Sequence, residues 1–263
     1  MGEALPSSTM SPPFPRALSR KAAAGQVFAL AAIIFGYDGL ALWLGGSASV
    51  LPERLLLSTF LTGALMLLFV TLFSLRDAGW RDSLGLGRFS PWATLGWAAL
   101  GVVTIYAANV AVGVLYLFVR GDVQAELASR AGWMQKLTAL PWSAILPLVV
   151  FVGFWEETVF RGFLLGRVRA ALPTMGGKAT SWQRDAAAVV LTALLFGMGH
   201  GYQGVLGIVQ TSMIGLVLGA LTLWRKSVWP AVVVHLTIDG VGLVAIKLIA
   251  PFLHELTRSQ IAP

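Results

Sequence analysis

Runs of about 20 apolar residues recur along the chain, and they constrain its fold more than any other feature. A helix needs about this length to cross the roughly 30 Å hydrocarbon core of a bilayer. The fifth such run is short, and the fourth can continue towards Leu172. The sequence therefore predicts an all-α, polytopic transmembrane bundle of about seven spans, within a range of about six to eight. The expected spans are residues 27–45, 55–75, 92–119, 142–165, 186–200, 204–224 and 228–249.

Composition agrees with a membrane protein. Of the 263 residues, 57% are hydrophobic and 12% are charged, and this charged fraction is about half that of a typical soluble domain. A formal charge of +7 would point to nucleic acid in a soluble protein, but in so apolar a chain the cations are better explained as anchors of cytoplasmic loops. Because cysteine is absent, disulfides, thiolate metal sites and a cysteine nucleophile are excluded.

Four segments organise the chain. Residues 1–26, rich in Pro and Ser, are expected to form a disordered cytoplasmic tail. Transmembrane helices of residues 27–140 follow, then a core of residues 141–250 that carries the candidate chemistry, and a C-terminal tail of residues 251–263. Twelve Lys and Arg residues lie in the tail and loops on the same side of the membrane as the N-terminus, and six lie on the other side. The N-terminus is therefore predicted to be cytoplasmic and, with seven spans, the C-terminus outside.

Ionisable residues within the spans are the first candidates for function, because a charge near the bilayer centre costs about 2.5–3.5 kcal/mol on insertion scales. The fourth span contains Glu156, Glu157 and Arg161. Glu157 and Arg161 lie one turn apart on one helical face and can neutralise each other, so we interpret them as mainly structural. Glu156 is rotated about 100° away and is left available for proton chemistry.

Two histidines lie at membrane depth in other spans. His200 ends the fifth span four residues after Phe196, and His235 lies in the seventh, one turn before Asp239. A lone buried histidine, or a Glu–Arg pair within one helix, is more often structural than catalytic. Together, however, two adjacent carboxylates, two imidazoles and a further Asp each cost insertion energy, and none is needed to hold helices together. The set predicts catalysis or transport.

Other residues within the spans have structural interpretations. Asn109 could line the same cavity, but a structural hydrogen bond explains its position equally well. Pairs of glycine four residues apart favour close helix packing; they are Gly162 and Gly166, Gly197 and Gly201, and Gly215 and Gly219.

The polar motifs resemble those of the CAAX protease and bacteriocin-processing enzyme family of intramembrane proteases, which includes the type II CAAX prenyl endopeptidases. The family pattern is Glu-Glu-x-x-x-Arg, then Phe-x-x-x-His, then His-x-x-x-Asn or Asp on successive helices. Each motif is weak alone, but all three in order on predicted spans are specific, and the resemblance covers about residues 142–245. Here the motifs are Glu156, Glu157 and Arg161, then Phe196 and His200, then His235 and Asp239.

This resemblance implies peptide-bond hydrolysis inside a helical bundle, with Glu156 as general base on a water molecule and both histidines positioning it. In family members, Asn often stands where this chain has Asp239, and bacterial members commonly have Asp. An amide can donate a hydrogen bond to an oxyanion, whereas an ionised carboxylate cannot. If Asp239 is ionised, the oxyanion must be stabilised by His235, His200 or backbone groups; if it is protonated, it can donate as Asn would.

A metal-dependent version of the reaction is the open alternative. Glu156, His200 and His235 make a two-histidine, one-carboxylate set that suits zinc and leaves a fourth position for water. The chain has no His-Glu-x-x-His helix of the kind found in soluble zinc proteases. The resemblance favours a reaction without a cofactor.

The leading interpretation is an intramembrane endopeptidase that cleaves near the C-terminus of a membrane-associated protein or peptide. One rival is a proton-coupled transporter with the same acids and imidazoles as a relay, although no internal repeat typical of transporters is visible. Another is a catalytically silent protein of bacteriocin immunity, against which the intact motifs argue. High Ala, Gly and Trp content favours a bacterial cytoplasmic membrane, where C-terminal sorting tails or peptide pheromones are more credible substrates than prenylated tails.

Overall fold

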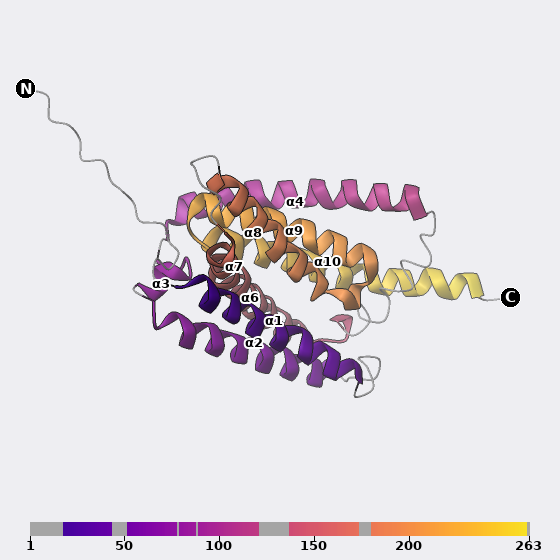
Figure 1. Ribbon diagram of the computed structural model, residues 1–263. Helices are drawn as coiled ribbons and strands as arrows, with labels where there is room; N and C mark the ends of the chain where they lie inside the picture. The colour runs from indigo at the N-terminus through magenta and orange to yellow at the C-terminus, as the bar shows by residue number, and fades with distance from the viewer. Residues whose placement is uncertain are drawn as a thin grey trace, which may run out of the picture.

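The structure is a computed structural model that describes residues 18–43, 52–77, 79–87, 89–120, 137–173 and 180–261. These residues form helices and connecting turns without any strand, which confirms the predicted all-α class. In Figure 1, α4 runs along one side of the bundle and α2 along the opposite side. The main helices are α1 (Arg20–Trp43), α2 (Pro52–Ser74), α3 (Trp80–Ser83), α4 (Pro91–Arg120), α6 (Trp142–Glu157), α7 (Leu165–Ala171), α8 (Thr180–Met198), α9 (Gly204–Arg225) and α10 (Trp229–Ile261).

Five segments within the described residues are long and apolar enough to cross a membrane. They match the second, third, fourth, sixth and seventh expected spans. The first and fifth expected spans coincide with helices α1 and α8, which are not among these five, and the end of the first lies outside the described residues. A count of seven spans therefore stays a prediction. The five are Leu56–Ser74, Pro91–Val119, Trp142–Ala171, Gly201–Arg225 and Trp229–Leu248.

Two helices extend beyond the boundaries that hydropathy predicts. Helix α1 begins at Arg20, so the expected disordered tail of residues 1–26 ends earlier, and its residues 1–17 lie outside the described part. Helix α10 continues to Ile261, so most of the expected C-terminal tail extends the last helix. Hydropathy marks only the apolar part of a helix, whereas polar residues such as Lys, Arg, Gln and Glu also sustain helical turns.

The fourth span is a continuous helix whose middle is widened. Residues Thr158–Leu164 form a π-helical segment, η2, between α6 and α7, and all of them are buried. This confirms that the span continues towards Leu172, which directly follows α7. Segments of π-helix are rare in proteins, and those that occur often lie at functional sites. Sequence spacing did not predict this one.

A short chain segment after α3 fastens η2 to the start of α10. A Cβ at Gly162 would lie 2.6 Å from the carbonyl oxygen of Leu84, so only glycine allows this close approach. Leu84 is buried in the main apolar core beside residues of η2. The next two carbonyl groups accept hydrogen bonds from α10 and its preceding turn: Gly85 from the Val228 N–H at 3.1 Å, and Leu86 from the Trp229 indole at 3.2 Å.

Glycines also bring α8 and α9 together, as the paired spacing predicts. A Cβ at Gly215 would lie 2.9 Å from the Cα of Ala193, and one at Gly197 would lie 2.6 Å from the carbonyl oxygen of Ile208. At Gly201, by contrast, no atom lies within 4 Å of an added Cβ. The close packing of α8 and α9 holds the turn between them, which carries His200, at a fixed place.

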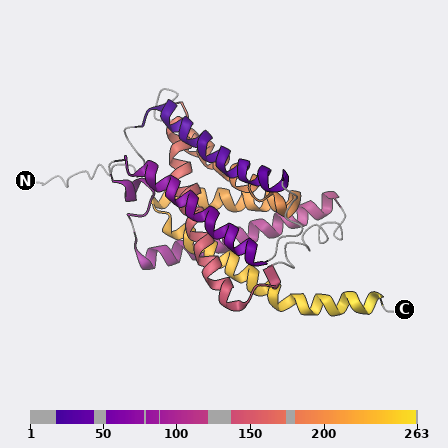
Figure 2. The same cartoon turned by 90° about the horizontal axis from the view of Figure 1, so that it is seen from below.

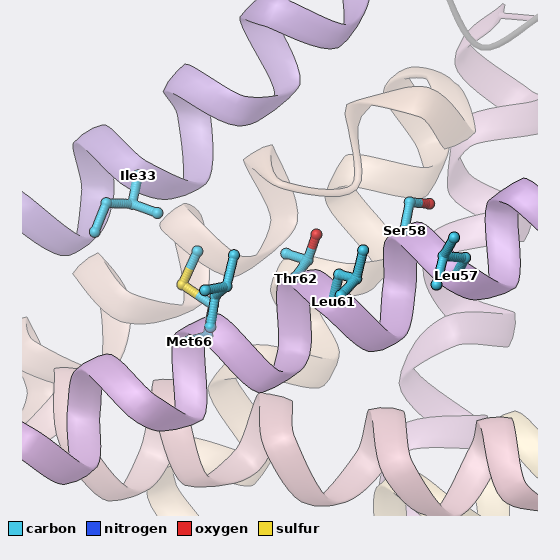
Figure 3. A pocket seen from close by; sticks show the side chains of 7 residues that line it. Ile33, Leu57, Ser58, Leu61, Thr62 and Met66 are labelled. Atoms are coloured by element: carbon cyan, nitrogen blue, oxygen red, sulfur yellow. The ribbon is translucent and has the colours of Figure 1, made fainter.

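A groove of about 340 Å³ lies between α1 and α2 (Figure 3). Helix α1 packs mainly on α7 and α2 on α6, and the ribbons of α1 and α2 diverge in the view of Figure 2. Most of the lining is apolar, and it includes none of the predicted site residues. The residues are Ile33 of α1 and Leu57, Ser58, Leu61, Thr62, Leu65 and Met66 of α2.

Candidate active site

The two adjacent carboxylates lie at the end of α6, directly before η2. Both are buried, and the side chain of Glu157 is completely inaccessible. The Nη1 atom of Arg161, in η2, donates a hydrogen bond to Oε1 of Glu157 at 2.9 Å. The predicted ion pair within one helix therefore forms. Because Arg161 is also buried, this carboxylate neutralises a charge that would otherwise be isolated in the bundle.

The same carboxylate also binds a histidine from α10, a contact that sequence reasoning missed. The Nδ1 atom of His235 lies 2.7 Å from Oε1 of Glu157. Because an ionised carboxylate only accepts hydrogen bonds, Nδ1 carries the proton of this contact. The Nε2 atom is then the ring nitrogen available for proton exchange. Glu157 thus orients the imidazole as well as pairing with Arg161.

The Nε2 atom of His235 faces two further carboxyl groups. It lies 3.8 Å from Oε2 of Glu156 and 3.3 Å from Oδ2 of Asp239, one turn further along α10. The first distance is too long for a direct hydrogen bond, and within the described residues Oε2 of Glu156 has no hydrogen-bond partner. The side chain of Asp239 is 37% exposed, that of Glu156 only 11%. The site is therefore closed behind Glu157 and open beside Asp239.

His200 lies in the turn that follows α8. Hydropathy predicts it as the last residue of the fifth span, but the helix ends before it. Its Nδ1 atom is 2.8 Å from the carbonyl oxygen of Phe196. Since a carbonyl only accepts, Nδ1 carries hydrogen and Nε2 is left as an acceptor. His200 is also close enough to Glu156 for an electrostatic interaction. The turn thus brings a second imidazole to the carboxylate of α6.

Phe196 holds the basic groups of the site around its ring. The ring centre lies 4.8 Å from that of His200 and 6.1 Å from that of His235. On the guanidinium side, the Cζ atom of Arg161 lies 4.1 Å from the Phe196 ring centre, in a cation–π arrangement. Phe196 itself is buried. It is expected to support the site by packing, and its contacts agree with that role.

Several buried polar atoms near the end of α6 have no hydrogen-bond partner among the described residues. They include Oε2 of Glu156, Oε2 of Glu157, Nη2 of Arg161 and the indole nitrogen of Trp155. Buried polar atoms are normally satisfied by protein or water. A group of several buried polar atoms without hydrogen-bond partners is typical of a site that binds water or a polar ligand.

The candidates for zinc do not form a metal site in this arrangement. Within the described residues, no three His, Asp or Glu side chains are grouped so that they could hold a metal ion. Metal dependence of the set Glu156, His200 and His235 stays a prediction, which elemental analysis can test. What the cluster offers instead is a row of acids and imidazoles suited to proton transfer.

Comparison with known proteins relates this part of the chain to a family. Residues 138–241 match the family model described as "Type II CAAX prenyl endopeptidase Rce1-like". This part of the chain is thus similar to an Rce1-like domain. This Rce1-like segment covers α6, η2, α7, α8, α9 and the start of α10, and it includes every residue of the three motifs. No curated protein and no solved structure matches the chain.

The match to a protease family and the apolar helices lead to the same broad conclusion. Within the described residues, five helices are long and apolar enough to cross a membrane, and residues 138–241 match a family of CAAX prenyl endopeptidases. The apolar helices indicate an integral membrane protein, and residues 138–241 are similar to a family of proteases. Helices α1, α2 and α4 lie outside the matched range.

Proposed function

We propose that this protein hydrolyses a peptide bond near the C-terminus of a membrane-associated protein or peptide, with Glu156 as general base. The observation that supports this most is the position of its Oε2 atom, which is buried, unpartnered within the described residues and 3.8 Å from Nε2 of His235. A water molecule bound there would lie between a proton acceptor and an imidazole. Such a water attacks the carbonyl carbon while its proton passes to Glu156.

The histidines complete the proposed reaction. When the water attacks, negative charge develops on the carbonyl oxygen and needs hydrogen-bond donors. A protonated Nε2 of His235, steadied through Nδ1 by Glu157, supplies one such donor. The C–N bond then breaks, and the proton taken up by Glu156 passes to the leaving amine. His200, whose ring also contacts that of Phe196, helps to hold the water through Nε2 as an acceptor.

Asp239 has a different part in this scheme. At 3.3 Å from Nε2 it holds the imidazole of His235 from the exposed side of the site. An ionised carboxylate cannot donate to an oxyanion, so in the ionised form Asp239 positions the ring of His235 and does not itself stabilise the oxyanion. The substrate is proposed to enter at this open side.

The proposed setting is a bacterial cytoplasmic membrane with the N-terminus in the cytoplasm. The unequal numbers of cations in alternate loops support this orientation. C-terminal sorting tails of exported proteins, or peptide pheromones, are the proposed substrates. No cofactor is needed in this scheme.

The decisive experiment compares the C-termini of surface proteins, by mass spectrometry, in cells with the wild-type protein and with Glu156→Gln. Gln keeps the shape of the side chain but cannot take up the proton, so processing of the substrate should cease while the protein still inserts into the membrane. Asp185→Asn is the matched control, because it removes a carboxylate charge from the partly exposed ion pair with Arg169, and processing should continue. Substantial cleavage by purified Glu156→Gln would exclude Glu156 as the base.

A further inference from the structure

Helix α4, outside the Rce1-like segment, carries a tyrosine and an asparagine deep within a candidate membrane span. They are Tyr106 and Asn109, three residues apart and therefore neighbours on the helix surface. Polar groups at such depth lose their hydration and usually face a cavity or a partner. The proposed reaction does not use either of them.

The register of α4 against α10 places Tyr106 at the level of Asp239. Both helices start at the same end of the bundle, where the rings of Phe89 and Trp229 lie 5.4 Å apart. Further in, a Cβ at Gly101 would lie 2.8 Å from the side chain of Val234. Each helix then rises about 7.5 Å over the next five residues, which brings Tyr106 and Asp239 to one depth.

The exposure and the electrostatic surroundings of Tyr106 agree with this register. Tyr106 is 39% exposed, so its ring is not sealed between helices. It is close enough to Asp239 for an electrostatic interaction. Tyr106 therefore borders the open side of the site, opposite the closed side formed by Glu157.

Asn109 lies where α4 meets α9. Its backbone carbonyl accepts a hydrogen bond from the side-chain amide of Gln210, on α9, at 3.3 Å. Its side-chain oxygen, Oδ1, is buried and has no partner among the described residues. An acceptor oxygen without a partner among the described residues thus lies one turn beyond Tyr106, where α4 meets α9.

We infer that Tyr106 and Asn109 form a subsite for the main chain of the substrate beside Asp239. A peptide offers both a carbonyl oxygen, which the Tyr106 hydroxyl can bind, and an N–H, which Oδ1 of Asn109 can bind. A lipid chain offers neither. The ligand class is therefore an extended polypeptide segment, and the inference rests on the proposed endopeptidase function.

Binding is measured without turnover, in the Glu156→Gln background. The probe is a fluorescein-labelled synthetic peptide covering the cleavage site found by the mass-spectrometric comparison above, and its Kd is obtained from fluorescence anisotropy in detergent. Tyr106→Phe and Asn109→Leu should each raise the Kd by about 2- to 12-fold, the loss expected for one hydrogen bond. In the active protein, the same changes should raise KM more than they lower kcat.

The matched control is Thr104→Val, which removes a hydroxyl from the same helix. That hydroxyl is exposed and donates to the carbonyl of Leu100 in its own helix, so the Kd should not change. An unchanged Kd in both Tyr106→Phe and Asn109→Leu, with normal unfolding temperatures, would overturn the subsite while leaving the proposed function in place. Absence of any Glu156-dependent processing would overturn the endopeptidase, and the subsite with it.

Discussion

At the scale of single residues, Glu156 and Glu157 are neighbours with different surroundings. Rotation about the helix directs Glu157 into the closed part of the bundle, where one oxygen contacts both Arg161 and His235. Glu156 keeps an unpartnered oxygen at the edge of the part that opens beside Asp239. Neighbouring residues of a helix point about 100° apart. This rotation makes one of two identical side chains a supporting group and the other a candidate base.

Glu157→Ala is predicted to damage folding as well as activity. It leaves Arg161 buried without its ion-pair partner, and breaking a buried pair in this way costs about 3–5 kcal/mol. Thermal unfolding in detergent should show a clearly lower midpoint than for Glu156→Ala, which removes no ion pair with Arg161. A Glu157→Ala protein with normal stability but no activity would reverse the roles of the two acids.

At the scale of elements, the π-helical segment η2 depends on the close approach of the chain after α3. The contact at Gly162 is with backbone, the carbonyl of Leu84, which cannot rotate away as a flexible side chain would. The same short segment binds the start of α10 through Gly85 and Leu86. It therefore links the helix of Glu157 to the helix of His235.

Gly162→Ala is predicted to destabilise the protein by about 1–3 kcal/mol, the usual cost of overpacking a core. Activity should fall as well, because the displaced backbone lies one residue from Arg161. Gly96→Ala on α4 is the control, since an added Cβ there meets no atom within 4 Å; it should be neutral or stabilise by about 0.5–1 kcal/mol. Equal unfolding midpoints for the two variants would show that η2 does not need this contact.

At the scale of the whole molecule, the two termini are predicted to lie on opposite sides of the membrane. The twelve cations of one set of loops against six of the other favour a cytoplasmic N-terminus. Because the chain has no cysteine, single cysteines added near Ser7 and Ser259 can be labelled selectively with a membrane-impermeant reagent. Only the second should react in intact cells. Labelling of both, or of neither, would mean an even number of spans.

Activity is predicted to survive chelators, since Glu156 and imidazole activate the water in the proposed scheme. Glu156→Ala, His200→Ala and His235→Ala would then lower the rate without changing metal content, which elemental analysis measures. About one zinc per chain, with activity removed by chelation and restored by zinc, would refute the metal-free scheme. Inhibition by a hydrophobic chelator alone does not decide the matter, because such a molecule can also block the site.

The sequence determined what depends on neighbours within one helix. Apolar runs placed five of the spans, and the four-residue spacing predicted both the Glu157–Arg161 pair and the approach of His235 to Asp239. These predictions hold because the period of an α-helix fixes which residues share a face. The ends of α1 and α10 were placed less well, since polar residues can continue a helix beyond its apolar part.

Tertiary structure alone decided which helices meet and in which register. The hydrogen bond between Glu157 and His235 joins residues 78 positions apart, and no spacing rule reaches across that distance. The widened segment η2 and the level of Tyr106 relative to Asp239 likewise depend on neighbouring helices. Such contacts arise from the packing of whole helix faces. Small residues such as Gly162 and Gly101 set how closely two segments approach and at what level they meet.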